Sequence, residues 1–85
     1  MKVYVLTDNY TNVETGESTH EVVGVYYTLE KAQERFNEKV KEAKKFMECY
    51  SNLEERKGKG FWIISEKDNY FALHIALFIR VKEVK

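Results

Sequence analysis

Apolar residues recur at alternating intervals of three and four between Thr28 and about Leu53, which is the spacing of one face of an α-helix. The positions that form this face are Leu29, Ala32, Phe36, Val40, Ala43, Met47, Tyr50 and Leu53. Thr28 is a favourable N-cap, because its hydroxyl can accept a hydrogen bond from a free amide of the first turn. We therefore predict a helix over residues 28–53 that buries a single apolar stripe.

The residues before this helix predict a β-hairpin with long arms. Residues 1–7 are rich in β-branched and aromatic side chains, as in a strand that is apolar on both faces. Gly16 lies in a polar stretch and supplies the positive φ of a tight turn, so the arms extend to about residue 13 and from residue 18 or 19 to residue 27. Gly24 indicates a bulge or a close backbone approach within the second arm. The predicted cross-strand neighbours are Leu6 with Val25 and Tyr4 with Tyr27.

The residues after the helix predict a second hairpin. Residues 54–60 lose the apolar period and contain two glycines, so we expect a flexible loop there. Residues 61–65 and 70–84 read as strands around a polar turn at 66–69, although the run 71–79 also allows a bulge or a short helical turn. The alternation over residues 79–84 is that of an edge strand or a half-exposed strand. The expected fold is α+β: a four-stranded antiparallel sheet, in the order ββαββ, with one long helix on one face.

The length of the predicted helix raises a question about what covers its end. A helix over residues 28–53 would be about 38 Å long, whereas a seven-residue strand spans roughly 23 Å. Either the arms of the first hairpin are long enough to match the helix, or its last turns project onto a second copy. The apolar residues in those last turns are Phe46, Met47, Tyr50 and Leu53.

Composition predicts one small cytoplasmic domain spanning residues 1–85. Fourteen basic residues balance 14 acidic residues, which argues against duplex DNA or an anionic membrane as a partner. The single cysteine cannot form an internal disulfide, and no apolar run approaches the ~18 residues of a membrane span. The first residues form a strand pattern at once, without the features of a signal peptide.

Aromatic residues make up 14% of the chain, and most lie in predicted strands whose alternation exposes some on each face. One helix cannot cover both faces, and exposed Tyr and Trp side chains are common at protein interfaces. The alternative is a wetted sheet face whose tyrosine hydroxyls meet water. We expect association, most simply a homodimer formed through the open sheet face or an edge strand. The candidate partner-binding residues are Tyr4, Tyr27, Tyr50, Trp62 and Phe78.

Reactive side chains are few and badly spaced for chemistry. Cys49 lies late in the helix, away from the positive end of its dipole, and is expected to be a half-buried structural thiol. His20, His74 and Asp8 show none of the paired short spacings of zinc ligands, and His74 reads as a core or interface histidine. We therefore predict no catalytic residue, no metal site and no cofactor, and expect the protein not to be an enzyme.

An alternative function is binding of single-stranded nucleic acid. Lys57 and Lys59 alternate with glycines just before Phe61 and Trp62, and basic residues beside aromatic rings are typical of surfaces on which bases stack. The balanced charge and the lack of an RNP-like motif weigh against this alternative. The same segment does not match a Walker loop and is by default a solvated linker.

The first strand at residues 1–7 and the segment Gly24-Val25-Tyr26-Tyr27-Thr28-Leu29-Glu30-Lys31-Ala32 resemble small uncharacterised proteins of bacteriophages and Gram-positive bacteria. Their pattern starts with a strand and continues as Gly-Val-aromatic-x-Ser/Thr-x-Glu-Lys-Ala at the start of a helix. The resemblance implies a mobile-element setting and a non-enzymatic role. Together with the aromatic surplus, it favours a small protein-binding module, in its narrowest form a phage-encoded inhibitor or modulator that occupies the surface of a host or defence protein.

Overall fold

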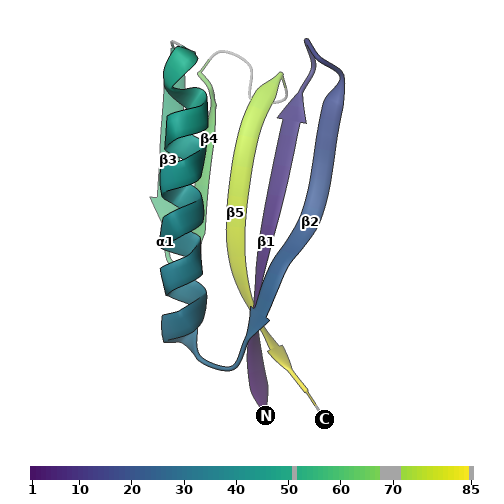
Figure 1. Cartoon of the computed structure of the whole chain (residues 1–85), viewed down its shortest axis with the longest axis vertical. Coiled ribbons are helices and arrows are strands. Elements are labelled where there is room, and N and C mark those ends of the chain that lie inside the picture. Colours follow the sequence, from purple (N-terminus) through teal and green to yellow (C-terminus); the bar gives the residue numbers. More distant parts are fainter. Residues whose placement is uncertain (51, 68–71, 85) are drawn as a thin grey trace.

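One helix and five antiparallel strands make up the regular structure of the chain in a computed structural model that describes residues 1–50, 52–67 and 72–84 (Figure 1). The strands form a single sheet, and the helix lies on one side of it. In chain order the elements are β1 (Lys2–Asn12), β2 (Glu17–Tyr26), α1 (Leu29–Phe46), the 3-10 turn η1 (Met47–Cys49), β3 (Leu53–Gly58), β4 (Phe61–Glu66) and β5 (Leu73–Glu83).

The sheet has the strand order β2-β1-β5-β4-β3, so the prediction of four strands is wrong, although the α+β class is right. Two hairpins, β1–β2 and β3–β4, lie on either side of the last strand. β5 pairs with β1 from Lys2–Glu83 to Asn12–Leu73 and with β4 from Phe61–Phe78 to Ser65–His74. The C-terminal strand therefore joins two halves that are separate in the sequence.

The helix begins as predicted and ends earlier. Thr28 caps it, because its hydroxyl oxygen accepts a hydrogen bond from the backbone N–H of Lys31 at 3.3 Å. α1 ends at Phe46 and the chain tightens into η1, after which Tyr50 has an extended conformation. Asn52 then has a φ of 61°, a left-handed conformation that asparagine tolerates better than most residues. The prediction of a helix to residue 53 is therefore wrong; Ser51, which falls in that range, lies outside the described residues.

The first hairpin has the long arms that its turn predicted. Gly16 has a φ of 75° in that turn. The register shifts between Leu6 and Thr7, which confirms the bulge that Gly24 indicated. A side chain at Gly24 would meet the ring of Tyr26, whose Oη would lie 2.6 Å from an added Cβ. The predicted neighbours were wrong by one residue on the second arm, because the observed pairs are Leu6 with Gly24 and Tyr4 with Tyr26.

β3 is the element that the sequence did not predict. Its sequence is Leu-Glu-Glu-Arg-Lys-Gly, and its charged side chains disfavour a strand in isolation. Pairing with the apolar strand β4 overrides that preference. Charged residues are typical of edge strands, where they discourage pairing with other chains. The expected loop at 54–60 is therefore an edge strand followed by a tight turn in which Gly60 has a φ of 81°.

The second predicted hairpin corresponds to β4 and β5. β5 is a continuous strand without a helical turn, and it is central rather than at an edge. The end of β5, predicted to be an edge or half-exposed strand, is partly uncovered. β4 pairs with β5 only as far as Phe78, and the rest of β5 pairs with β1 alone. Half of the predicted polar turn at 66–69 and the predicted start of the last strand fall at 68–71, outside the described residues, and Glu66 is the last residue of β4.

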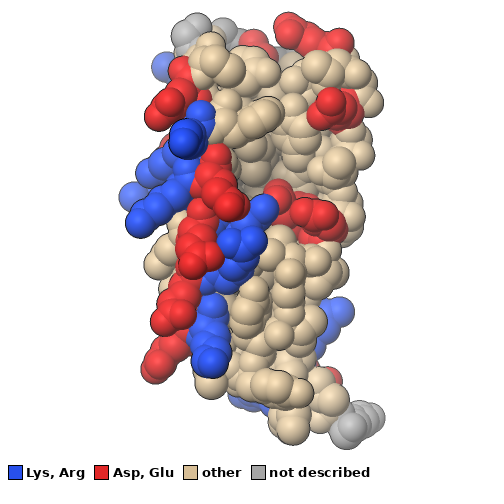
Figure 2. All heavy atoms as spheres, in the orientation of Figure 1, with Lys and Arg blue, Asp and Glu red and all other residues tan. Residues whose placement is uncertain are grey.

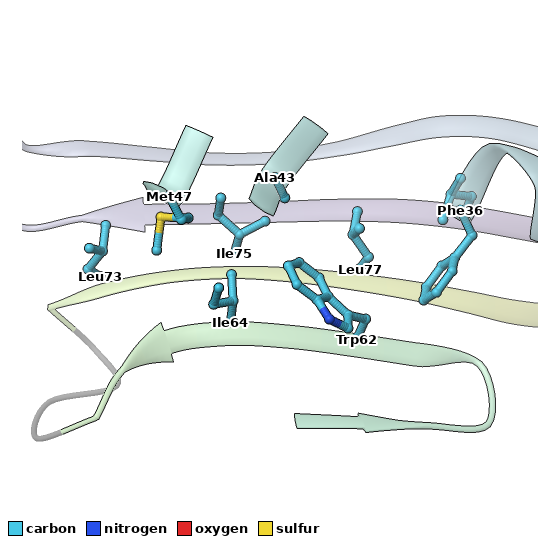
Figure 3. Close-up of a cluster of buried hydrophobic side chains, with 9 residues drawn as sticks. Phe36, Ala43, Met47, Trp62, Ile64, Leu73, Ile75 and Leu77 are labelled. Carbon is cyan, nitrogen blue, oxygen red and sulfur yellow. The ribbon is translucent and has the colours of Figure 1, made fainter. Parts of the chain in front are cut away.

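The core lies between α1 and the β4–β5 part of the sheet (Figure 3). One cluster of buried side chains fills this space. It contains Trp62 and Ile64 of β4, Leu77 of β5, and Phe36 and Met47 from the helix and the turn that follows it. The apolar stripe predicted for the helix is confirmed by the burial of Ala32, Phe36, Ala43 and Met47, although Leu29 at its start is 48% exposed. No helix in the described parts of the chain combines the length and the apolar character needed to cross a membrane.

A single helix cannot cover a sheet of this width. Five strands, with about 4.8 Å between neighbours, place the outermost strands about 19 Å apart, whereas a helix is about 10–12 Å across. The backbone of α1 comes closest to β5, β1 and β2. The whole sheet face opposite α1 therefore stays without a covering element among the described residues.

Candidate binding surfaces

The sheet face opposite the helix, which we call the open face, is apolar at its centre. Alternation along β1 places Val5 and Thr7 there, and the register adds neighbours from the other strands. One row across the sheet contains Val22, Thr7, Phe78 and Phe61, and the next contains Val25, Val5 and Arg80. Val25 is 58% exposed and Val22 is also exposed, while Val5, Phe61 and Phe78 are half-buried. The open face thus presents a mainly apolar strip that starts at the β2 edge and includes Thr7.

Charged groups border this strip on the side of β3 and at the end of β5. The guanidinium of Arg80 lies 5.4 Å from the centre of the Phe78 ring, in a cation–π arrangement. Arg56 on β3 pairs with Glu54 at 3.1 Å, and both are exposed to solvent. An apolar centre with a polar rim is the usual anatomy of a protein interface.

The structure distributes the predicted partner-binding residues over different surfaces. Phe78 lies on the open face, whereas Tyr4 and Trp62 alternate to the side of the helix. Tyr27 follows β2 and is 77% exposed, and Tyr50 is half-buried against the core. Trp62 is only 3% exposed, so its indole belongs to the core. Of the three predicted residues that lie in strands, only Phe78 is on the open face.

The residues proposed for nucleic-acid binding are likewise separated. Lys59 lies in the turn between β3 and β4, and Lys57 lines a hollow of about 430 Å³ between α1 and β3. The same hollow contains the edge of Trp62 and the ion pair between Lys44 and Glu55, at 3.5 Å. Because Trp62 is buried, it does not present a ring face on which a base could stack.

A second hollow, which we call the α1–β1 groove, lies on the face of the sheet that carries the helix. It has a volume of about 380 Å³, and α1, β1, β2 and β5 contribute its walls. Ala43 of the helix and Ile75 and Leu77 of the central strand close its base and are themselves buried. The rings of Tyr10 and Phe46 meet edge to face, with centroids 5.6 Å apart. Its volume is typical of sites that accept a small molecule or a side chain.

Acidic groups dominate the charge of the α1–β1 groove. Asp8, Glu17 and Glu42 line it together with one cation, Lys39. The ammonium of Lys39 lies 3.4 Å from Asp8 Oδ2 and 3.6 Å from Glu42 Oε2. Asp8 Oδ1 is buried and has no hydrogen-bond partner among the described residues. Figure 2 shows this face of the molecule, with acidic and basic side chains interleaved along α1 and further acidic side chains across from it over the neighbouring strands.

A second basic side chain on the helix, Arg35, is paired with a carboxylate of the same helix. Arg35 Nη1 donates a hydrogen bond to Glu38 Oε2 at 2.8 Å. That hydrogen bond raises the pKa of Arg35, so the guanidinium stays charged. Arg35 does not line the groove, and Lys39 is the cation that does.

The cysteine and the two histidines lie on different parts of the structure. Cys49 in η1 is exposed rather than half-buried, and its thiol lies 3.7 Å from the carbonyl oxygen of Phe46. His20 and His74 alternate to the open face on β2 and β5, whereas Asp8 faces the helix. Within the described residues, no group of three or more His, Cys, Asp or Glu side chains is placed to hold a metal ion.

The residues that sequence reasoning missed are those whose role depends on the sheet order. Val22 and Val25 are ordinary strand valines in the sequence, and only their position at the β2 edge exposes them. Asp8, Lys39 and Glu42 come together because β1 lies beside the path of the helix. No sequence spacing connects residue 8 with residue 39.

Comparison with known proteins identifies a family but no relative of known role. A family model described as a domain of unknown function, DUF7336, matches residues 1–61, which include β1, β2, α1 and β3. Searches among curated proteins and among solved structures gave no match.

Proposed function

The chain belongs to the DUF7336 family, a domain of unknown function, and from its surface we propose that it is a non-enzymatic protein-binding module that associates with a second copy of itself through the open face. The observation that supports this proposal is the exposed apolar strip that runs from Val22 and Val25 at the β2 edge to Phe61 and Phe78. No described element covers it. Contiguous apolar surface of this kind usually marks an association site in a small protein.

The size of the open face suits a dimer. The Cα atoms extend over 42 × 21 × 17 Å, and the two longer axes lie in the plane of the sheet (Figure 1). The projected area of the face is therefore at most about 900 Å², close to the ≈ 800 Å² that each partner contributes to an interface of standard size. A two-fold axis through the face would pack the strip of one protomer on that of its partner, as in other isologous dimers.

Light scattering during gel filtration tests the proposal. The chain has a mass of 10.1 kDa, and the proposal expects a species of twice that mass at micromolar concentration. Val25→Glu places a carboxylate in the apolar strip, where burial without a partner costs several kcal/mol, so dimerisation should weaken by roughly 100-fold or more.

Val81→Glu is the matched control. Val81 is 56% exposed, lies on β5 and alternates to the opposite face, so the same charge is added to the same sheet at nearly the same exposure. The proposal expects this variant to remain a dimer. A monomeric wild-type protein, or equal behaviour of the two variants, contradicts association through the open face.

A narrower form of this proposal is that the protein is an inhibitor, as the resemblance to phage and Gram-positive proteins implies. It requires the open face to bind a different protein in a host cell and to occupy that protein's surface. An affinity purification with wild type and both valine variants tests it, because a specific partner should be lost with Val25→Glu and kept with Val81→Glu. A partner retained by both variants would bind elsewhere on the molecule.

One observation favours single-stranded nucleic acid as a second candidate. Phe61 and Phe78 are directly opposite each other on the open face, and Arg80 lies over the Phe78 ring. Paired aromatic side chains on neighbouring strands, with arginine beside them, are features of sheet surfaces on which bases stack. Fluorescence anisotropy with a labelled oligo-dT at low salt tests this candidate. It predicts binding that weakens with salt and with Phe78→Leu, and an unchanged anisotropy removes it.

A further inference from the structure

We propose that the α1–β1 groove is a binding site for an arginine side chain of a partner protein, separate from the open face. The groove is lined by apolar residues below, by two aromatic rings at one wall and by three carboxylates. Each of these features matches one part of an arginine side chain. The inference does not depend on the dimer proposed above, because the groove lies on the opposite side of the sheet.

The charge of the groove selects a cation. Three carboxylates, those of Asp8, Glu17 and Glu42, face one ammonium, that of Lys39. Lys39 is shared between two of them at 3.4 Å and 3.6 Å, which are long distances for charge-assisted hydrogen bonds. Asp8 Oδ1 stays without a partner among the described residues although it is buried. A second cation would relieve this excess of negative charge, whereas an anion would add to it.

The apolar surface of the groove selects a long side chain over a small ion. The rings of Tyr10 and Phe46 line the groove above the nearly buried Ala43 and Ile75, and the methylene groups of an arginine could lie along these rings. Phe46 is 51% exposed, so its ring is accessible to a partner. A guanidinium can stack on such a ring and also bind a carboxylate through two N–H groups, which an ammonium cannot do as well.

The site is tested with a probe that isolates the side chain. N-acetyl-arginine methylamide is titrated into the ¹⁵N-labelled protein, and backbone amide shifts are followed by NMR. Saturable shifts are expected at Tyr10, Ala43 and Phe46, with a dissociation constant in the millimolar range because one side chain supplies few contacts. N-acetyl-citrulline methylamide has the same shape without the charge, and it should bind at least fivefold more weakly.

Variants at the rim separate charge from stacking. Glu42→Gln removes one carboxylate and Phe46→Leu removes the ring while keeping apolar bulk, and each should weaken binding of the arginine probe severalfold. Glu48→Gln is the matched control, because Glu48 is exposed in η1 and does not line the groove. Its binding should equal that of the wild type.

The outcomes decide between this site and its alternatives. Equal shifts with the arginine and citrulline probes would show an apolar hollow without selection for charge and would overturn the proposal. Shifts outside the groove, or none that saturate, would also overturn it. Val25→Glu keeps the two proposals apart, because a variant that no longer dimerises should still bind the arginine probe with unchanged affinity.

Discussion

Truncation of Leu77 to alanine tests whether the core is centred on β5. Leu77 is fully buried, pairs with Trp62 on β4 and lies under the helix (Figure 3). The substitution removes three carbon atoms, worth about 2.4 kcal/mol at ≈ 0.8 kcal/mol per buried methylene, and the cavity that remains adds to that cost. We expect a loss of about 3–4 kcal/mol from the free energy of unfolding.

This loss is large for a chain of this size. At 0.05–0.15 kcal/mol per residue, the whole domain is stabilised by about 4–13 kcal/mol. Urea unfolding followed by fluorescence measures the change, because the only tryptophan of the chain is Trp62, which is buried in the same cluster. With a slope of about 1 kcal/mol per molar urea, the midpoint should fall by about 3 M.

A matched leucine provides the control. Leu29 is 48% exposed at the start of α1, and alanine there is a good helix former, so Leu29→Ala should cost less than about 1 kcal/mol. If Leu77→Ala does not fold, Leu77→Val removes less volume and should still cost more than Leu29→Ala. Similar losses at the two positions would refute a core organised around β5.

Two further predictions concern the ends of elements. Thr28→Ala removes the hydrogen bond to the N–H of Lys31 and should cost about 0.5–1 kcal/mol in urea unfolding, whereas Thr28→Ser should cost little. Gly16 and Gly60 both have positive φ, but an added Cβ has open space at Gly16 and lies 3.3 Å from the carbonyl oxygen of Ile79 at Gly60. Gly16→Ala should therefore cost about 1 kcal/mol, and Gly60→Ala should cost more; thermal melts that reverse this order would contradict the turn geometry.

Features that depend on local chemistry could be predicted from the sequence. The cap at Thr28, the turn at Gly16 and the bulge near Gly24 each follow from what one residue type allows its own backbone to do. The apolar stripe of the helix follows from its period. These features fixed the α+β class but not the number of strands.

Features that depend on pairing with distant residues could not be predicted. β3 is a strand because it lies beside β4, and its own charged residues favour other conformations. The helical period continued through Tyr50 to Leu53 in the sequence, although the chain turns at Asn52 to start that strand. The exposed valines and the groove depend in turn on the strand order, so the candidate sites were less predictable than the fold.

The position of β5 has a consequence for how the protein is made. Every other strand precedes it in the chain, yet it occupies the middle of the sheet and contacts both hairpins. A ribosome therefore delivers the two hairpins before the strand that holds them together, and the sheet cannot close while β5 is still being synthesised. Until then the inner edges of β1 and β4 are unpaired, and this interval is when the nascent chain is most exposed to aggregation and to proteolysis.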